Sequence, residues 1–275
     1  MREESILRKI FRIIALILVS IVFLGPFLWM VFTSFKPHAE ALRLPPTFLP
    51  ETWVPQNYAD AWQSGPFLHY TKNSVIVTLS VVALQLLTII PASYAFAKMD
   101  FKGKKILFSL ILVTMMIPAQ LIFLPVYLMF SKVNLINSYW SLILPWASSA
   151  FGIFLLRQRF MQVPDEKIEA AVLDNTPTWK IIYKIMLPQA KGTVITIALF
   201  TFISEWNDYF WPLVMTSNDD IRTLPLGVSM LKSTLDGIHR NTVMAGNVIL
   251  ILPIVIIYLF AQKEIIKAFT YSGIK

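Results

Sequence analysis

The sequence predicts an all-α membrane protein with six transmembrane helices, on three grounds: composition, the length of its apolar stretches, and the placement of its basic residues. Of 275 residues, 56% are hydrophobic and 15% are charged, against about 45–50% and about 25% in a soluble domain. The mean hydropathy of +0.63 excludes a soluble globular enzyme and a disordered chain. We therefore treat residues 1–275 as a single transmembrane domain.

Six stretches have the length of about 20 apolar residues that is needed to cross a ~30 Å hydrocarbon core. They lie at roughly 11–32, 73–95, 106–130, 139–156, 193–215 and 243–262. The first follows Arg8, Lys9 and Arg12, as the apolar part of a signal peptide would. It is too long for one, however, and no small-residue cleavage site precedes Lys36, so we expect it to remain as an anchor.

An even number of spans places both termini on one side of the membrane. Seventeen of the 24 Lys and Arg residues fall in the terminal segments and loops on that side, and seven fall opposite. Because basic residues concentrate in cytoplasmic loops, both termini are predicted to be cytoplasmic. The net charge of +8 thus reflects topology and contact with anionic lipid rather than nucleic-acid binding.

The residue inventory argues against chemistry within this chain. Cysteine is absent, and the three histidines are far apart, so we expect no metal site and no thiol nucleophile. Gly103-Lys104 lacks the preceding glycine of a phosphate-binding loop. We therefore predict no catalytic residue, no metal and no cofactor in this chain.

The sequence of the inside loop 157–191 predicts a helix, a sharp turn and a second helix. Pro164 and the acids Asp165 and Glu166 favour a helix start, and Asn175 is suited to a left-handed helix stop. Thr176 and Pro177 can then begin a second helix, which must end or bend near Leu187-Pro188. From the residues alone, this amphipathic pair either rests on lipid headgroups or docks a cytoplasmic partner.

Two motifs resemble those of a known family. The inside loop contains Glu169-Ala170-Ala171, then three residues, Asn175, nine residues and Ile185-Met186-Leu187-Pro188. This spacing resembles the EAA loop of ABC importer permeases. That loop has glycine where this chain has Asn175, and Asn is the next-best residue at positive φ. Span five contains Trp206-Asn207-Asp208-Tyr209-Phe210-Trp211-Pro212-Leu213. This segment resembles the corresponding segment in the carbohydrate branch of these permeases, which includes the maltose permease G subunit. The tail 269–275 also fits that branch.

The resemblance implies a type I importer permease fold in a bacterial cytoplasmic membrane. It also implies half of a translocation path for a carbohydrate-type solute, completed by a second, homologous permease. Two ATPase subunits, which carry ATP and Mg, would dock on loop 157–191 and near the tail, and a solute-binding protein would meet outer loops 33–72 and 216–242. The residues that the resemblance assigns to ATPase coupling are Glu169, Ala170, Ala171, Val172, Leu173, Asp174, Asn175, Ile185, Leu187 and Pro188.

Polar residues in span five are candidates for the translocation path. Glu205 and Asp208 are three residues apart and so share a helical face. Acids at membrane depth face the bundle interior or a water-filled cavity. The candidate residues are Glu205, Trp206, Asn207, Asp208 and Tyr209. Their alternative role is structural, in hydrogen bonds to neighbouring helices, and the alternative function is an ion-coupled secondary transporter that uses Glu205 and Asp208.

Overall fold

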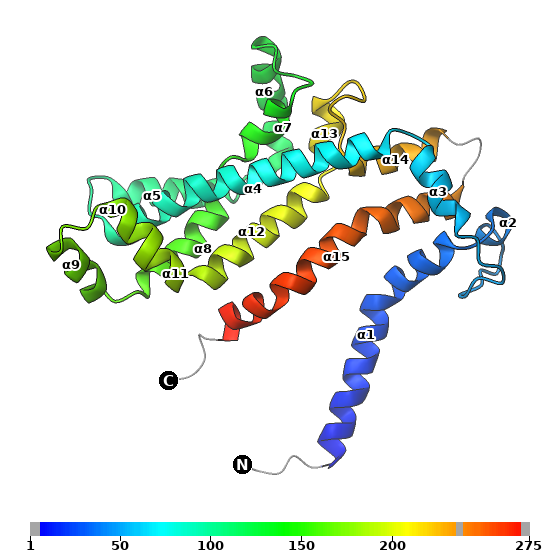
Figure 1. Ribbon diagram of the computed structural model, residues 1–275, viewed down its shortest axis with the longest axis horizontal. Coiled ribbons are helices and arrows are strands. Elements are labelled where there is room, and N and C mark those ends of the chain that lie inside the picture. Colours follow the sequence, from blue (N-terminus) through cyan, green and yellow to red (C-terminus); the bar gives the residue numbers. More distant parts are fainter. Residues whose placement is uncertain (1–5, 235–238, 271–275) are drawn as a thin grey trace. The chain divides into compact units, whose positions relative to one another are not determined.

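A computed structural model describes residues 6–234 and 239–270, and within these ranges every regular element is a helix (Figure 1). Residues 271–275 lie outside the described ranges, and with them most of the tail that the sequence predicts near the ATPase. The helices are α1 (Ile6–Ser34), α2 (His38–Ala41), α3 (Gln56–Gln63), α4 (Phe67–Lys98), α5 (Lys104–Thr114), α6 (Ala119–Lys132), α7 (Tyr139–Ile143), η1 (Leu144–Trp146), α8 (Ala150–Met161), α9 (Glu166–Leu173), α10 (Thr178–Lys180), η2 (Ile181–Met186), α11 (Leu187–Gln189), α12 (Lys191–Trp206), α13 (Phe210–Met215), α14 (Leu224–Thr234) and α15 (Arg240–Thr270).

Three single helices and three bent pairs are long and apolar enough to cross a membrane. The single helices cover Leu7–Ser34, Phe67–Lys98 and Arg240–Lys263. Each bent pair counts as one span at most, so the described chain has up to six candidate spans. Together with the absence of strands among the described residues, this confirms the predicted fold class of an all-α membrane protein.

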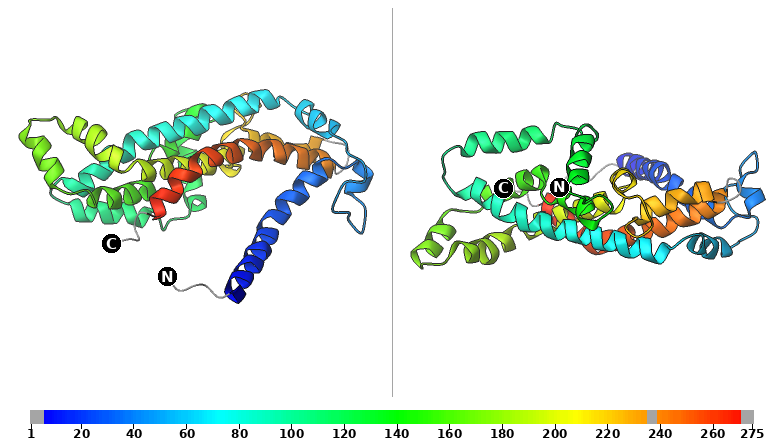
Figure 2. Two further views of the ribbon diagram at one scale, coloured as in Figure 1. Left: turned by 60° about the horizontal axis from the view of Figure 1, so that its bottom comes forward. Right: turned by 90° about the horizontal axis from the view of Figure 1, so that it is seen from above.

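Three of the predicted spans are not continuous helices. The stretch 106–130 breaks at 115–118, and α5 and α6 meet there at 99° (Figure 2). Pro118 has no N–H and disfavours helical geometry in the residue before it, which explains this break. The stretch 139–156 breaks at 147–149, where Ser149 is extended and its hydroxyl caps α8 by accepting the N–H of Gly152 at 3.2 Å. The stretch 193–215 breaks at 207–209, between α12 and α13.

The chain divides into two compact units, residues 1–68 with 227–253 and residues 69–226 with 254–275. The first contains α1 and the outer loop that follows it. This loop is ordered: the Asn57 side chain donates to the carbonyls of Ser34 and Lys36 at 2.8 and 2.9 Å. The buried Lys36 ammonium donates to the Thr47 carbonyl and lies 4.7 Å from the centre of the Trp29 ring. The outer loop is thus tied to the end of α1.

Glu40 should make the outer loop sensitive to acid. Burial alone would raise the pKa of this carboxyl, but hydrogen bonds from the Thr47 hydroxyl and the Glu51 N–H outweigh it and lower the pKa below 4.5. A lowered folded pKa adds stability above the unfolded value, and this stability is lost as the pH falls through the folded value. We expect cleavage of the loop by an acid-active protease to rise below about pH 4.5, and Glu40→Gln to flatten this pH dependence. An equal rise in the variant would contradict the assignment.

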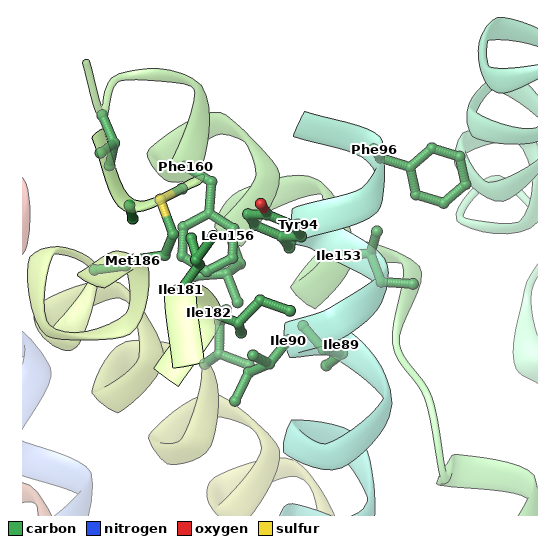
Figure 3. Packing of buried hydrophobic residues seen from close by; sticks show 14 residues of the cluster. Ile89, Ile90, Tyr94, Phe96, Ile153, Leu156, Phe160, Ile181, Ile182 and Met186 are labelled. Atoms are coloured by element: carbon green, nitrogen blue, oxygen red, sulfur yellow. The ribbon is translucent and has the colours of Figure 1, made fainter. Parts of the chain in front are cut away.

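The second unit has an apolar core where the C-terminal part of α4 packs against α8 and the inside loop (Figure 3). Leu156 and Phe160 of α8 meet Ile181 and Met186 of η2, and all four are buried. Ala171 of α9 belongs to the same cluster. The inside loop is therefore packed on the bundle as a folded element. A separate cluster joins α4, α7 and α13 through Val77, Val81, Leu142, Ile143, Trp211 and Met215.

Candidate functional site

The first candidate site is the turn that ends α9 in the inside loop. Asn175 has φ of 52°, as the sequence predicts for a left-handed stop. The N–H of Asn175 donates to the carbonyl of Val172, and the N–H of Thr176 donates to that of Ala171, both at 2.9 Å. This pair of bonds is the Schellman arrangement, which satisfies carbonyls left free at a helix end. The turn therefore survives the exchange of the family's glycine for asparagine.

The α9 helix presents two acids, Glu166 and Glu169, and two large apolar side chains to the surface. Val172 and Leu173 are 58% and 82% exposed, and Glu169 beside them is exposed and makes no ion pair with any described residue. Ala170 and Asp174 are exposed, whereas Ala171 is buried in the core. Trp179 and Tyr183 add two more exposed rings on the next helix. Exposed apolar side chains grouped around an unpaired charge are typical of an interaction surface.

Polar contacts hold this loop to the bundle. The Lys98 ammonium, at the end of α4, donates to the Val163 carbonyl at 2.7 Å and to Asp165 at 2.5 Å. Arg159 donates to the Gln189 carbonyl at 3.0 and 3.1 Å, and Lys167 donates to the Gln189 side chain at 3.0 Å. Asp165 lies at the start of α9 and Gln189 ends α11, so both ends of the loop are fixed.

The second helix of the loop differs in detail from the sequence prediction. It begins at Thr178, with Pro177 rather than Thr176 at the cap position. It then widens into a π-helix over Ile181–Met186 and continues through Pro188 to Gln189, before an 86° bend into α12. Pro188 has no N–H to donate to the preceding turn, so the regular α-helical hydrogen-bond pattern is interrupted there. Of the predicted coupling residues in this part, Pro188 is exposed, and Ile185 and Leu187 are partly buried.

The second candidate site is a cavity of about 610 Å³ beside the break between α12 and α13. Glu205 and Asp208 both line it, with aromatic rings and short polar side chains around them. The other lining residues are Gln85, Thr114, Met115, Ala119, Gln120, Trp146, Ser148, Ser149, Ala150, Phe151, Ile197, Phe200, Thr201, Ser204, Phe210 and Trp211. Such a mixture of rings, hydroxyls and amides suits a ligand that is itself polar on its edges and apolar on its faces.

Of the five predicted path residues, Glu205 and Asp208 line this cavity, and Trp206, Asn207 and Tyr209 do not. Trp206 is only 2% exposed and stacks on Phe202 with ring centres 5.4 Å apart. Asn207 donates to the Ile203 carbonyl of its own helix at 2.8 Å. Tyr209 is exposed and is not among the residues that line the cavity. Glu205 and Asp208 are therefore the two that face the cavity.

Sequence reasoning missed the polar residues that complete the cavity wall. Gln85 of α4 donates to the Trp146 carbonyl at 2.9 Å and accepts from the Thr201 hydroxyl at 2.8 Å. These bonds join α4, η1 and α12 at membrane depth. The signal in the sequence was Gln85, a single amide within an apolar span. Such an amide is costly in a membrane unless it forms hydrogen bonds with other parts of the protein.

Asn175 allows a test of the α9 turn. Asn175→Gly should leave the loop intact or stabilise it slightly, because glycine adopts positive φ without steric cost. Asn175→Val should cost about 1–2 kcal/mol, because a β-branched residue clashes in this conformation. The measurement is protease sensitivity of loop 157–191 in the purified protein. Equal sensitivity of the two variants would show that the turn is not formed in this way.

Comparisons with known proteins place the chain in a family. Residues 86–270 match the family described as binding-protein-dependent transport system inner membrane component. The chain is 33% identical over 253 residues to an arabinooligosaccharides transport system permease protein, AraQ, of Halalkalibacterium halodurans, covering 91% of this chain and 90% of the relative. It is 30% identical over 253 residues to the diacetylchitobiose uptake system permease protein NgcG of Streptomyces coelicolor, covering 91% of this chain and 83% of that protein.

A solved structure matches the fold over nearly the whole chain. It is the crystal structure of a bacterial ABC transporter involved in the import of the acidic polysaccharide alginate. The TM-score is 0.84 at 25% sequence identity, covering 96% of this chain and 99% of that one. Because the family match spans well over half of the residues and the similar permeases match over 91% of this chain, the chain belongs to the family of binding-protein-dependent transport system inner membrane components.

Proposed function

We propose that this chain is a permease subunit of an ATP-driven importer for a carbohydrate-type solute and that it couples to a separate ATPase through the inside loop. The observation that carries the proposal is the surface of α9, where Glu169, Val172 and Leu173 are exposed on a rigidly held helix. Burying two apolar side chains in a partner is favourable, and an unpaired carboxylate can add a charge-assisted hydrogen bond.

The ATPase subunits supply the energy in this proposal, and ATP and Mg bind there rather than to this chain. Closure of the ATPase pair moves α9, and the bundle shifts between inward-facing and outward-facing states because the nucleotide favours one of them. The chain itself performs no catalysis. Both of its termini lie on the cytoplasmic side of the bacterial inner membrane, together with α9.

The solute class follows from the cavity and from the relatives. Hydroxyl, amide and carboxylate groups line the cavity together with Trp146 and Trp211, and sugars combine hydrogen-bonding edges with faces that stack on rings. The named relatives belong to systems for arabinooligosaccharides and diacetylchitobiose. A second, homologous permease would close the other half of the path, and a solute-binding protein would deliver the sugar to loops 33–72 and 216–242.

Glu169→Ala tests the coupling. In proteoliposomes with both permeases, the ATPase and the binding protein, we expect ATP-driven uptake to fall roughly 10- to 100-fold, since a hydrogen bond to a charged group contributes about 1.5–3 kcal/mol. Glu166→Ala is the matched control, because Glu166 is also an exposed acid of α9. Unchanged uptake in Glu169→Ala would remove this residue from coupling. Wild-type uptake that follows a proton gradient and ignores ATP would replace the proposal with ion-coupled transport through Glu205 and Asp208.

A further inference from the structure

A second, much smaller cavity also borders the two acids of span five. Its free volume is about 10 Å³, which is the room that one water molecule requires. It is lined by Ser74, Val77, Thr78, Leu142, Glu205, Asp208, Trp211, Pro212 and Thr223. Glu205 and Asp208 also line the large cavity, so the acid pair borders both cavities.

Two hydroxyl groups in this small cavity have no hydrogen-bond partner among the described residues. Thr78 of α4 is 0% exposed, and Thr223, directly before α14, is 4% exposed. Neither Oγ1 atom forms a hydrogen bond with another described residue. A buried hydroxyl without a partner is costly, and most such groups in native proteins are satisfied by protein or by ordered water.

The acceptors that could satisfy these hydroxyls line the same cavity. Oδ1 of Asp208 accepts the Trp211 N–H at 3.3 Å, and a carboxyl group can accept several hydrogen bonds. Glu205 makes no hydrogen bond to a described residue through its carboxylate. Because the hydroxyls and the carboxylates border one cavity without bonding to each other, a small molecule that both donates and accepts can bridge them.

We propose that one water molecule occupies this cavity and joins the Thr78 and Thr223 hydroxyls to the Glu205–Asp208 pair. It donates its two hydrogens to carboxyl oxygens of the pair and accepts from the two hydroxyls, the number of partners usual for a buried water. A hard cation fits the lining less well, because such ions take six or more oxygen ligands. Val77, Leu142, Trp211 and Pro212 offer apolar surface instead, and the Ser74 hydroxyl already accepts the Leu224 N–H at 2.8 Å.

This water would link three segments that the covalent chain leaves far apart. Thr78 belongs to α4, the acids border the break between α12 and α13, and Thr223 ends the outer loop before α14. The Ser74–Leu224 hydrogen bond lies beside it and joins α4 to the same end of that loop. The water would thus help to hold the break in span five, independently of the transported solute and of ATPase coupling.

The first test is a map of the assembled transporter in lipid nanodiscs, at a resolution that shows waters. We expect a single peak within hydrogen-bonding distance of both threonine hydroxyls, unchanged when sodium is replaced by choline. The peak should be lost in Thr78→Val and kept in Thr78→Ser. A cavity without density in the wild type, or a peak that requires sodium, would overturn the proposal.

The second test is a double-mutant cycle, read as the thermal midpoint of the assembled complex. Since both hydroxyls serve one water, Thr78→Val and Thr223→Val together should lower the midpoint little more than the larger single effect. Thr33→Val is the matched control: Thr33 is another buried, unpartnered hydroxyl, outside this cavity, and its effect should add to that of Thr78→Val. Full additivity of the two cavity variants would show that they share no bridging molecule.

Discussion

Leu173→Asp is expected to separate the permease from its ATPase while leaving its own fold intact. Leu173 is 82% exposed at the end of α9, so the free chain loses little, about 0.5 kcal/mol as for other surface substitutions. On docking, the leucine would bury apolar area worth about 1.5–3 kcal/mol, and the variant would instead bury a charge. We therefore expect ATPase retention and ATP-driven uptake to fall by at least roughly 10- to 100-fold.

The readout for Leu173→Asp is the amount of ATPase that co-purifies with the permease pair, measured beside uptake in proteoliposomes. Leu173→Met keeps the apolar area and should behave as the wild type. If the aspartate variant retains the ATPase in normal amount and transports at the normal rate, α9 is not the contact surface, whatever the result for Glu169.

Phe160→Ala is expected to have the largest effect on stability. The Phe160 side chain is fully buried among Leu156, Ile181 and Met186, the cluster that holds the inside loop on the bundle (Figure 3). Truncating a buried phenylalanine costs about 3–5 kcal/mol, from lost transfer energy and from the cavity that remains. We expect early unfolding of the loop region and poor assembly with the ATPase.

Thermal unfolding of the purified permease pair, with protease mapping of loop 157–191, measures this effect. Met161→Ala is the control, because Met161 is the next residue of α8 and is exposed; its cost should be about 0.5 kcal/mol or less. Similar losses for the two variants would mean that the core does not depend on Phe160.

The inside loop was predictable from the sequence because its signals are local. Pro164 and Asp165 precede α9 directly, and Asn175 stops it at positive φ. The π-helical turn was not predicted, since a periodicity of apolar residues does not distinguish a widened turn from a regular one. The proline at 188 marked the right region, and the bend comes at residue 190 instead.

The breaks within the spans, and the cavity beside one of them, were harder to predict from the sequence. Hydropathy averaged over a window of about 19 residues does not register a three-residue break such as 147–149, which contains no charge. The cavity joins Gln85, Trp146 and Thr201, which are separated by many residues and meet only through tertiary packing. The acids were identified because charges at membrane depth are rare, whereas the orphan hydroxyls of Thr78 and Thr223 look ordinary in the sequence.

The Lys98 side chain connects the start of α9 to the end of α4. One ammonium group at the end of α4 holds both the Val163 carbonyl and the Asp165 carboxylate, so the base of α9 cannot pivot freely on its connecting backbone. Arg159 and Lys167 hold the far end of the loop at Gln189 in the same way. If the ATPase displaces α9 as proposed, these hydrogen bonds give the displacement a route to the ends of α4 and α11 in addition to the connecting backbone.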